Sequence, residues 1–244
     1  MRSDLLEAQA SIHWPSSQFL PFHARLDEWL NANVRIEIRD VPPPATHNPI
    51  VAVETELLPL AFSVEAGAYI NAIRSSLDIL AMALVRRHRV EIDERKVQFP
   101  IFWSEHAFTK ESGGPLLQRL PDAERSIIEA LKPYPEGNAA LWTLHHLDIV
   151  RKHRRLLDVR IQPIHMSMEG ALKPGDFEPL ATGTIQANDE TVLGLLRKGV
   201  PEPAIRSSFY VALTEPGYVG RKPILAALIH LADVAANIIS RFDR

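Results

Sequence analysis

Hydrophobic and polar positions follow two different periods along this chain. Between residues 64 and 87 apolar side chains recur every three to four positions, the period of one buried helix face. Residues 19–32, 138–157 and 223–242 repeat that spacing, so we expect helices there too. The first of these is expected to begin after Pro21, because proline is favoured in the first turn of a helix.

Other segments alternate with a period of two, which is typical of half-buried strands. Residues 34–39 alternate apolar and charged side chains, and residues 50–57 alternate again after a proline-rich loop, so a hairpin is expected. Three further strand-like stretches are residues 159–165, 180–186 and 208–213. Together these patterns predict an α+β fold, with a helical core of about four to five helices packed against a small antiparallel sheet.

The 244 residues are expected to form a single α+β domain. Within it, residues 18–60 supply an N-terminal helix and hairpin, and residues 61–157 supply the helical core. Residues 158–244 add the remaining strands and a closing helix, whose broad apolar face would allow a homodimer.

Composition narrows the function classes. The formal net charge of −3 gives no overall basic field to attract nucleic acid. The absence of cysteine excludes disulfides, thiolate metal sites and a cysteine nucleophile. The first residues lack the apolar stretch of a signal peptide, and no run reaches the roughly 18 apolar residues that span a bilayer. We therefore expect a cytoplasmic protein without a membrane partner.

The helix at 64–87 carries a polar stripe beside its apolar face. Gly67, Asn71, Arg74 and Asp78 share that stripe. An interior glycine costs roughly 1 kcal/mol against alanine, so it often marks the close approach of another backbone or of a ligand. Arg74 and Asp78, one turn apart, are expected to pair. The favoured interpretation is a structural tie to a neighbouring segment, and the alternative is a ligand-binding or catalytic stripe.

The helix at 138–157 places two histidines on an apolar arc. His146 and His153 fall inside that arc, whereas Asp148 falls on the opposite side and His145 at the boundary. Buried imidazoles need hydrogen-bond partners. We therefore expect a structural polar cluster between the two helices, made of Arg74, Asp78, His146 and His153.

The alternative for the same residues is chemistry. His153 would act as a general base, with Arg74 and Asp78 as the other catalytic candidates. The candidates for binding an anion are Asn71, Arg74, Lys152 and Arg154. A metal is not expected, because a separation of seven residues sets the two histidines about 10 Å apart along a helix. No cofactor is expected either, since the glycine-rich phosphate and dinucleotide motifs are missing.

These motifs resemble those of a widespread family of uncharacterised bacterial proteins. In that family one helix reads approximately G-D-x-x-H-N-x-R-S-x-L-D-H-L, a later helix ends in D-K-H-R, and an F-P-I tripeptide lies between them. The matching residues here are Gly67, Arg74, Ser75, Asp78, Phe99, Pro100, Ile101, Lys152, His153 and Arg154. The family's polar positions at Ala68, Asn71, Ala72, Ile79 and Arg151 differ. The resemblance therefore implies a fold more than an activity.

The helix pair is also similar, more distantly, to HEPN-type domains, which bind or cleave RNA. Their motif is an arginine and a later histidine on one helix, with four to six residues between them. Only Arg160–His165 has that spacing, and it lies in a strand-like stretch containing Pro163. The leading expectation is therefore a non-enzymatic binding or interaction protein. The alternative is a HEPN-like RNA-binding protein, or a metal-independent ribonuclease or other hydrolase that uses His153 as its base.

Overall fold

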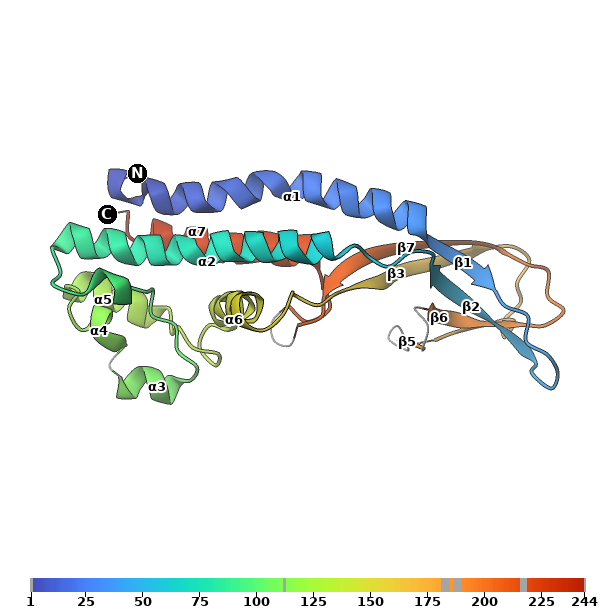
Figure 1. Cartoon of the computed structure of the whole chain (residues 1–244). Helices are drawn as coiled ribbons and strands as arrows, with labels where there is room; N and C mark the ends of the chain where they lie inside the picture. Colours follow the sequence, from blue (N-terminus) through green and yellow to red (C-terminus); the bar gives the residue numbers. More distant parts are fainter. Residues whose placement is uncertain (1, 112, 181–184, 187–189, 216–218, 244) are drawn as a thin grey trace. The chain divides into compact units, whose positions relative to one another are not determined.

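The computed structural model describes residues 2–111, 113–180, 185–186, 190–215 and 219–243 (Figure 1). About half of the structure is helical and the rest includes antiparallel sheets, so the predicted α+β class is confirmed. The contacts divide the chain into two compact units with boundaries at 22/23, 59/60, 159/160 and 212/213. The single domain expected from the sequence stays a prediction.

The helices within the described residues outnumber the expected four to five. They are α1 (Leu6–Asn33), α2 (Leu60–His88), α3 (Glu105–Lys110), α4 (Gly114–Leu117), α5 (Asp122–Ala130), α6 (Ala139–His153) and α7 (Ile224–Ser240), with 3-10 turns at Ser3–Leu5 and Glu94–Lys96. The strands are β1 (Val34–Ile38), β2 (His47–Glu54), β3 (Val159–Glu169), β4 (Phe177–Pro179), β5 (Ile185–Gln186), β6 (Glu190–Arg197), β7 (Ala204–Leu213) and β8 (Lys222–Pro223). The extra helices are short turns in the proline-rich stretch before α6.

The first unit is built around α2, which contacts both α6 and α7. The apolar side of α2 is buried along its length, at Ile70, Ile73, Leu77, Leu80 and Leu84. Figure 1 shows α7 running alongside α2. The apolar face of α7 is buried within this unit, at Ala227, Leu228, Leu231, Ala235 and Ile238. The face that the sequence offers for dimerisation is therefore already covered.

By length and composition α2 could also cross a membrane. In its most apolar 18-residue window, 61% of the residues are buried inside the structure, as in the core helix of a soluble protein. The structure is therefore consistent with a soluble protein, and the cytoplasmic location stays a prediction.

The start of α1 differs from the sequence prediction. The helix contains both Pro15 and Pro21, so the expected beginning after Pro21 is wrong. Each proline removes one backbone N–H from the helix ladder, which normally bends or ends a helix. Here the turns around Pro21 bury aromatic surface: Phe19 and Phe22 pack edge to face on Tyr69, with ring centroids 5.7 and 5.5 Å from that of Tyr69. Such burial offsets the lost hydrogen bonds.

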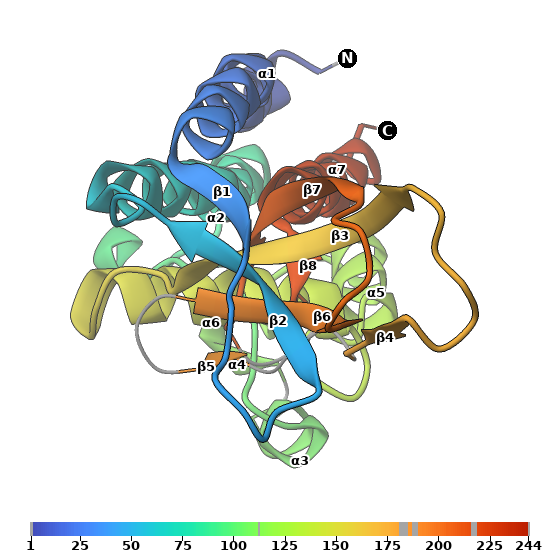
Figure 2. The same ribbon diagram turned by 90° about the vertical axis from the view of Figure 1, so that its right-hand side faces the viewer.

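The second unit contains most of the strands. One sheet has the order β1-β2-β6-β4, with β5 also on β6, and β3 pairs with β7 in another (Figure 2). The predicted hairpin is confirmed, with Ile36 opposite Ala52. The residues at the centre of this unit's core are Ile50, Ala52, Leu193 and Leu196.

The search for alternating apolar and polar residues missed β6, because most of the central residues of this strand are buried. Val192, Leu193, Gly194 and Leu196 are all buried, so no alternation marks this central strand. Most of the strand expected at 180–186 lies outside the described residues. The strands expected at 159–165 and 208–213 are confirmed as parts of β3 and β7. The helix expected to reach residue 157 ends at His153, and Arg154 leaves the helical backbone conformation.

Candidate functional site

A buried arginine occupies the centre of the interface between α2 and α6. Arg74 is 3% exposed. Its Nη1 donates to Asp78 Oδ1 at 2.7 Å, and its Nε donates to His145 Nδ1 at 3.2 Å. Its second terminal nitrogen donates to the carbonyl of Phe99 at 3.4 Å. A buried guanidinium is costly unless its donors are used, and here all three nitrogens have partners.

Asp78 holds the same loop residue as Arg74 does. Its Oδ1 accepts the backbone N–H of Phe99 at 2.8 Å, in addition to the bond from Arg74. The ion pair therefore binds both the N–H and the C=O of Phe99, whose ring is 2% exposed. These two hydrogen bonds attach the loop that contains Phe99 to α2.

His145 completes this group from α6. Burial and then the positive charge of Arg74 lower the pKa of His145 to about 4, so the imidazole is neutral near pH 7. Since Nδ1 accepts the bond from Arg74, the network assigns the proton to Nε2. A histidine held in this state donates from Nε2 and makes a poor base at Nδ1.

A second polar group lies farther along the same two helices. Asn71 donates to Asp148 Oδ1 at 3.1 Å, and Lys152 Nζ lies 2.6 Å from Asp148 Oδ2. Arg151 Nε is 3.7 Å from the same carboxylate. Asp148 is 4% exposed and is thus a buried anion surrounded by donors. Its expected place on the solvent side of α6 is wrong.

Gly67 makes the close approach that an interior glycine suggests. A Cβ at this position would lie 2.8 Å from Cδ and 2.9 Å from Cγ of Arg151. The missing side chain therefore leaves room for Arg151 of α6 to lie across α2. The approaching group is a side chain and not a backbone.

The two histidines expected in the cluster lie elsewhere. His146 is half-buried and stacks on Trp142 of its own helix, with ring centroids 4.9 Å apart. His153 is the last residue of α6 and its side chain is exposed, so its expected burial is wrong. The structure therefore brings Arg74 and Asp78 to His145, and does not bring them to His153.

The error has a geometric cause. The sequence assignment treated residues 154–157 as helical and let Leu156 and Leu157 help define the apolar arc. The helix ends at His153, and its buried positions lie on a different face, which includes Leu141, Leu144, Leu147, Asp148 and Val150. One residue along a helix is a rotation of about 100°, which is the difference between His146 and His145.

The anion-binding candidates are likewise separated. Asn71 and Lys152 meet on Asp148, and Arg74 belongs to the neighbouring group. Arg154 follows the helix with an exposed side chain. Among the described residues, no group of three His, Asp or Glu side chains could hold a metal ion.

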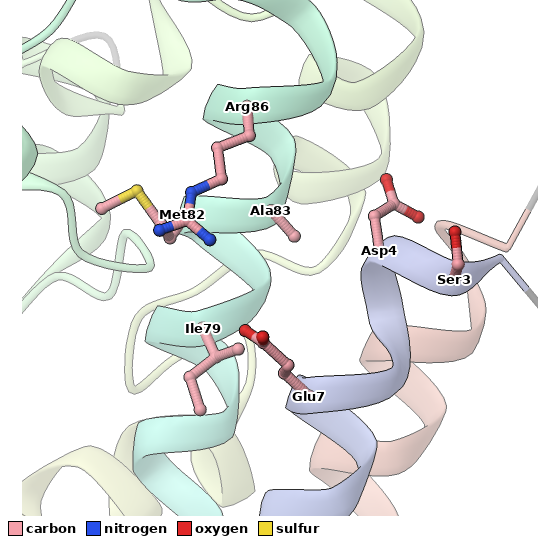
Figure 3. Close-up of a pocket in the computed structure, with 7 residues that line it drawn as sticks. All are labelled: Ser3, Asp4, Glu7, Ile79, Met82, Ala83 and Arg86. Carbon is pink, nitrogen blue, oxygen red and sulfur yellow. The ribbon is translucent and has the colours of Figure 1, made fainter.

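A separate cleft of about 300 Å³ lies between the start of the chain and α2 (Figure 3). Its lining comprises Ser3, Asp4, Glu7, Ile79, Met82, Ala83 and Arg86. In Figure 3 the side chains of Glu7 and Arg86 project toward the space from facing helices. Asp4 is held by Arg87 Nε at 2.7 Å, and this hydrogen bond lowers the pKa of the Asp4 carboxyl. The sequence analysis missed this cleft, because it placed no helix before residue 19.

No family model, curated protein or solved structure matches the chain. The resemblance to a bacterial family and to HEPN-type domains therefore stays a prediction.

Proposed function

We propose that the chain is a non-enzymatic binding or interaction protein in which the polar groups between α2 and α6 hold the fold together. The observation that carries this proposal is the state of Arg74: it is buried, and each of its nitrogens donates within the molecule. A catalytic or anion-binding arginine needs a donor that is left for its ligand. Every nitrogen of Arg74 already donates to a protein acceptor, and at 3% exposure the side chain presents almost no surface to a ligand.

The charges in the cluster support the same proposal. The Asp148 carboxylate accepts a hydrogen bond from Asn71 and pairs with Lys152. The Asp78 carboxylate accepts from Arg74 and from the Phe99 N–H. Neutral His145 is fixed by its bond from Arg74. Such mutual satisfaction is what a buried polar network needs in order to stabilise a fold.

The rival function, RNA binding or cleavage with His153 as base, would use the end of α6 instead. Lys152, His153 and Arg154 are exposed there. In that case Arg74 could not stabilise a phosphate beside His153, because it is committed to His145 and Asp78. The HEPN-type spacing at Arg160–His165 falls within β3 and not on a helix.

The test compares two arginines of different burial. Arg74→Ala should lower the free energy of unfolding by about 3 kcal/mol, because it leaves Asp78 and the Phe99 carbonyl without their partner. Arg154→Ala is the matched control, since its side chain is exposed, and it should change stability by less than about 0.5 kcal/mol. Urea titration followed by circular dichroism measures both.

An RNA cleavage assay on the same proteins addresses the rival. If the wild-type chain cleaves RNA, and His153→Ala or Arg154→Ala abolishes cleavage without changing the unfolding free energy, the proposed function is wrong. An Arg74→Ala variant as stable as wild type would contradict the structural role of the cluster.

A further inference from the structure

Strand β1 is the outer strand of its sheet, and its hydrogen bonds to β2 fix the direction of every backbone group in it. Thr55 N donates to Asn33 O at 2.8 Å, and Arg39 N donates to Pro49 O at 3.0 Å. In an antiparallel pair, hydrogen-bonded positions alternate with non-bonded ones. The odd-numbered residues of β1 therefore bond to β2, and Val34, Ile36 and Ile38 direct their N–H and C=O groups outward.

No strand pairs with this outward side of β1 in the part of the chain that the structure describes. A cleft of about 520 Å³ adjoins the same strand, with Val34 and Ile36 among its lining residues. Leu30, Ile205 and Phe209 provide further apolar lining, and Asp27, Asn31, Ser207 and Ser208 provide polar lining. An unpaired strand edge beside open space is a template for another strand.

The sequence of β1, Val-Arg-Ile-Glu-Ile, is complementary to itself in antiparallel orientation. When two copies are centred on Ile36, that residue faces Ile36 of the second copy, and Val34 faces its Ile38. These are the residues whose backbone groups point outward, so the register that pairs them also satisfies their hydrogen bonds. A register shifted by one residue would not.

The same register matches the charges. Arg35 then lies opposite Glu37 of the second copy, and Glu37 lies opposite its Arg35, in non-hydrogen-bonded pairs where Cα atoms approach to about 4.5 Å. Both side chains are exposed, on the face away from the core. Arg35 has no ion-pair partner among the described residues, and Glu37 is 3.8 Å from Arg39, whose guanidinium is bound to Glu190.

We propose that two copies of this chain associate by antiparallel pairing of β1 with β1, which joins their sheets into one. The inference rests on the proposed interaction function and deepens it by naming the partner as a second copy. Natural edge strands usually avoid this pairing with like charges, prolines or bulges. The opposite charges of Arg35 and Glu37 instead favour it.

Sedimentation velocity over a range of protein concentrations tests the pairing. Wild type should sediment as a dimer. Arg35→Glu places acids opposite acids, and Glu37→Arg places arginines opposite arginines, so each single variant should raise the dissociation constant at least tenfold. The double variant R35E/E37R restores opposite charges and should dimerise again. Arg95→Glu is the control, because that exposed residue lies in the 3-10 turn Glu94–Lys96 of the other compact unit and should leave the dimer intact.

A mixing experiment separates pairing from misfolding. Equimolar R35E and E37R proteins should form a heterodimer, since two acids then face two arginines, although neither protein dimerises alone. Wild type that stays monomeric, whether or not it binds an extended peptide from elsewhere, would overturn the proposal. So would a dimer that R35E leaves unchanged. Neither result would alter the unfolding free energies of the Arg74 and Arg154 variants, so the two proposals can fail separately.

Discussion

Arg74 Nε donates to His145 Nδ1 across the interface of α2 and α6, with a distance of 3.2 Å between the two nitrogens. This bond joins a residue whose charge is permanent to one whose charge depends on pH. It is formed only while Nδ1 of His145 carries no proton. The interface between the two core helices is therefore sensitive to protonation at a single atom.

We predict that this interface weakens in mild acid. The pKa of His145 falls from an ordinary 6.5 to about 4 in the folded chain, so below pH 6.5 the unfolded chain binds this proton more readily. The stabilisation is complete above pH 6.5 and is lost progressively as the pH falls toward 4. For one proton the slope cannot exceed about 1.4 kcal/mol per pH unit. NMR titration of the imidazole measures the pKa directly.

His145→Asn provides the matched variant, because an amide oxygen can accept from Arg74 and does not titrate. The difference in stability between wild type and this variant should change between pH 6.5 and 4. A constant difference over that range would show that His145 titrates normally.

We predict opposite outcomes for truncating two histidines of α6. His145→Ala should lower the unfolding free energy by about 1–3 kcal/mol, since it leaves a donor of buried Arg74 unpaired. His153→Ala should change it by less than about 0.5 kcal/mol, because that side chain is exposed. Urea unfolding at pH 7.5 distinguishes them, and equal costs would refute the assignment of His145 as the cluster histidine.

We predict that Gly67 and Arg151 are energetically coupled. Gly67→Ala should gain up to about 1 kcal/mol of helix propensity, yet its methyl group would lie under 3 Å from Arg151 side-chain carbons. The expected net effect is a loss of about 1 kcal/mol. In an Arg151→Ala background the clash is absent, so the same substitution should become stabilising. A double-mutant cycle measures this change of sign, and additive effects would contradict it.

We predict that two adjacent arginines differ in their contribution to stability. Arg155 donates to both carboxylate oxygens of Glu215, at 2.7 and 3.0 Å, and Glu215 is 1% exposed. Arg155→Ala should therefore cost about 2 kcal/mol, because a buried carboxylate loses its charged partner and is left with the neutral Asp158 N–H as its donor among the described residues. Arg154→Ala, one position earlier, serves as the control. Thermal unfolding followed by circular dichroism compares them, and indistinguishable melting temperatures would contradict the prediction.

The polar stripe of α2 was predictable from the sequence, whereas its partners on α6 were not. Gly67, Asn71, Arg74 and Asp78 share one side of a long helix with unambiguous spacing, and three of them contact α6 side chains directly. The rotation of α6 depends on where that helix ends. The basic run Arg151–Arg155 favours a helix C-terminus, but it extends past His153, and no glycine or proline marks the residue at which the helix ends.

By itself the sequence determined the fold class, the position of the main helices and the β1–β2 hairpin, because these follow from local periodicity. Tertiary structure decided which charges became buried and matched. The sequence placed Arg74 in a cluster with the wrong histidines and Asp148 on the solvent side, and only packing gave them His145 and Asn71 as partners. It also decided that α1 continues through two prolines, since aromatic burial on Tyr69 offsets the local cost. The local pattern indicates which secondary structure a segment prefers. The free energy gained by burying its side chains depends on which other segments pack against it.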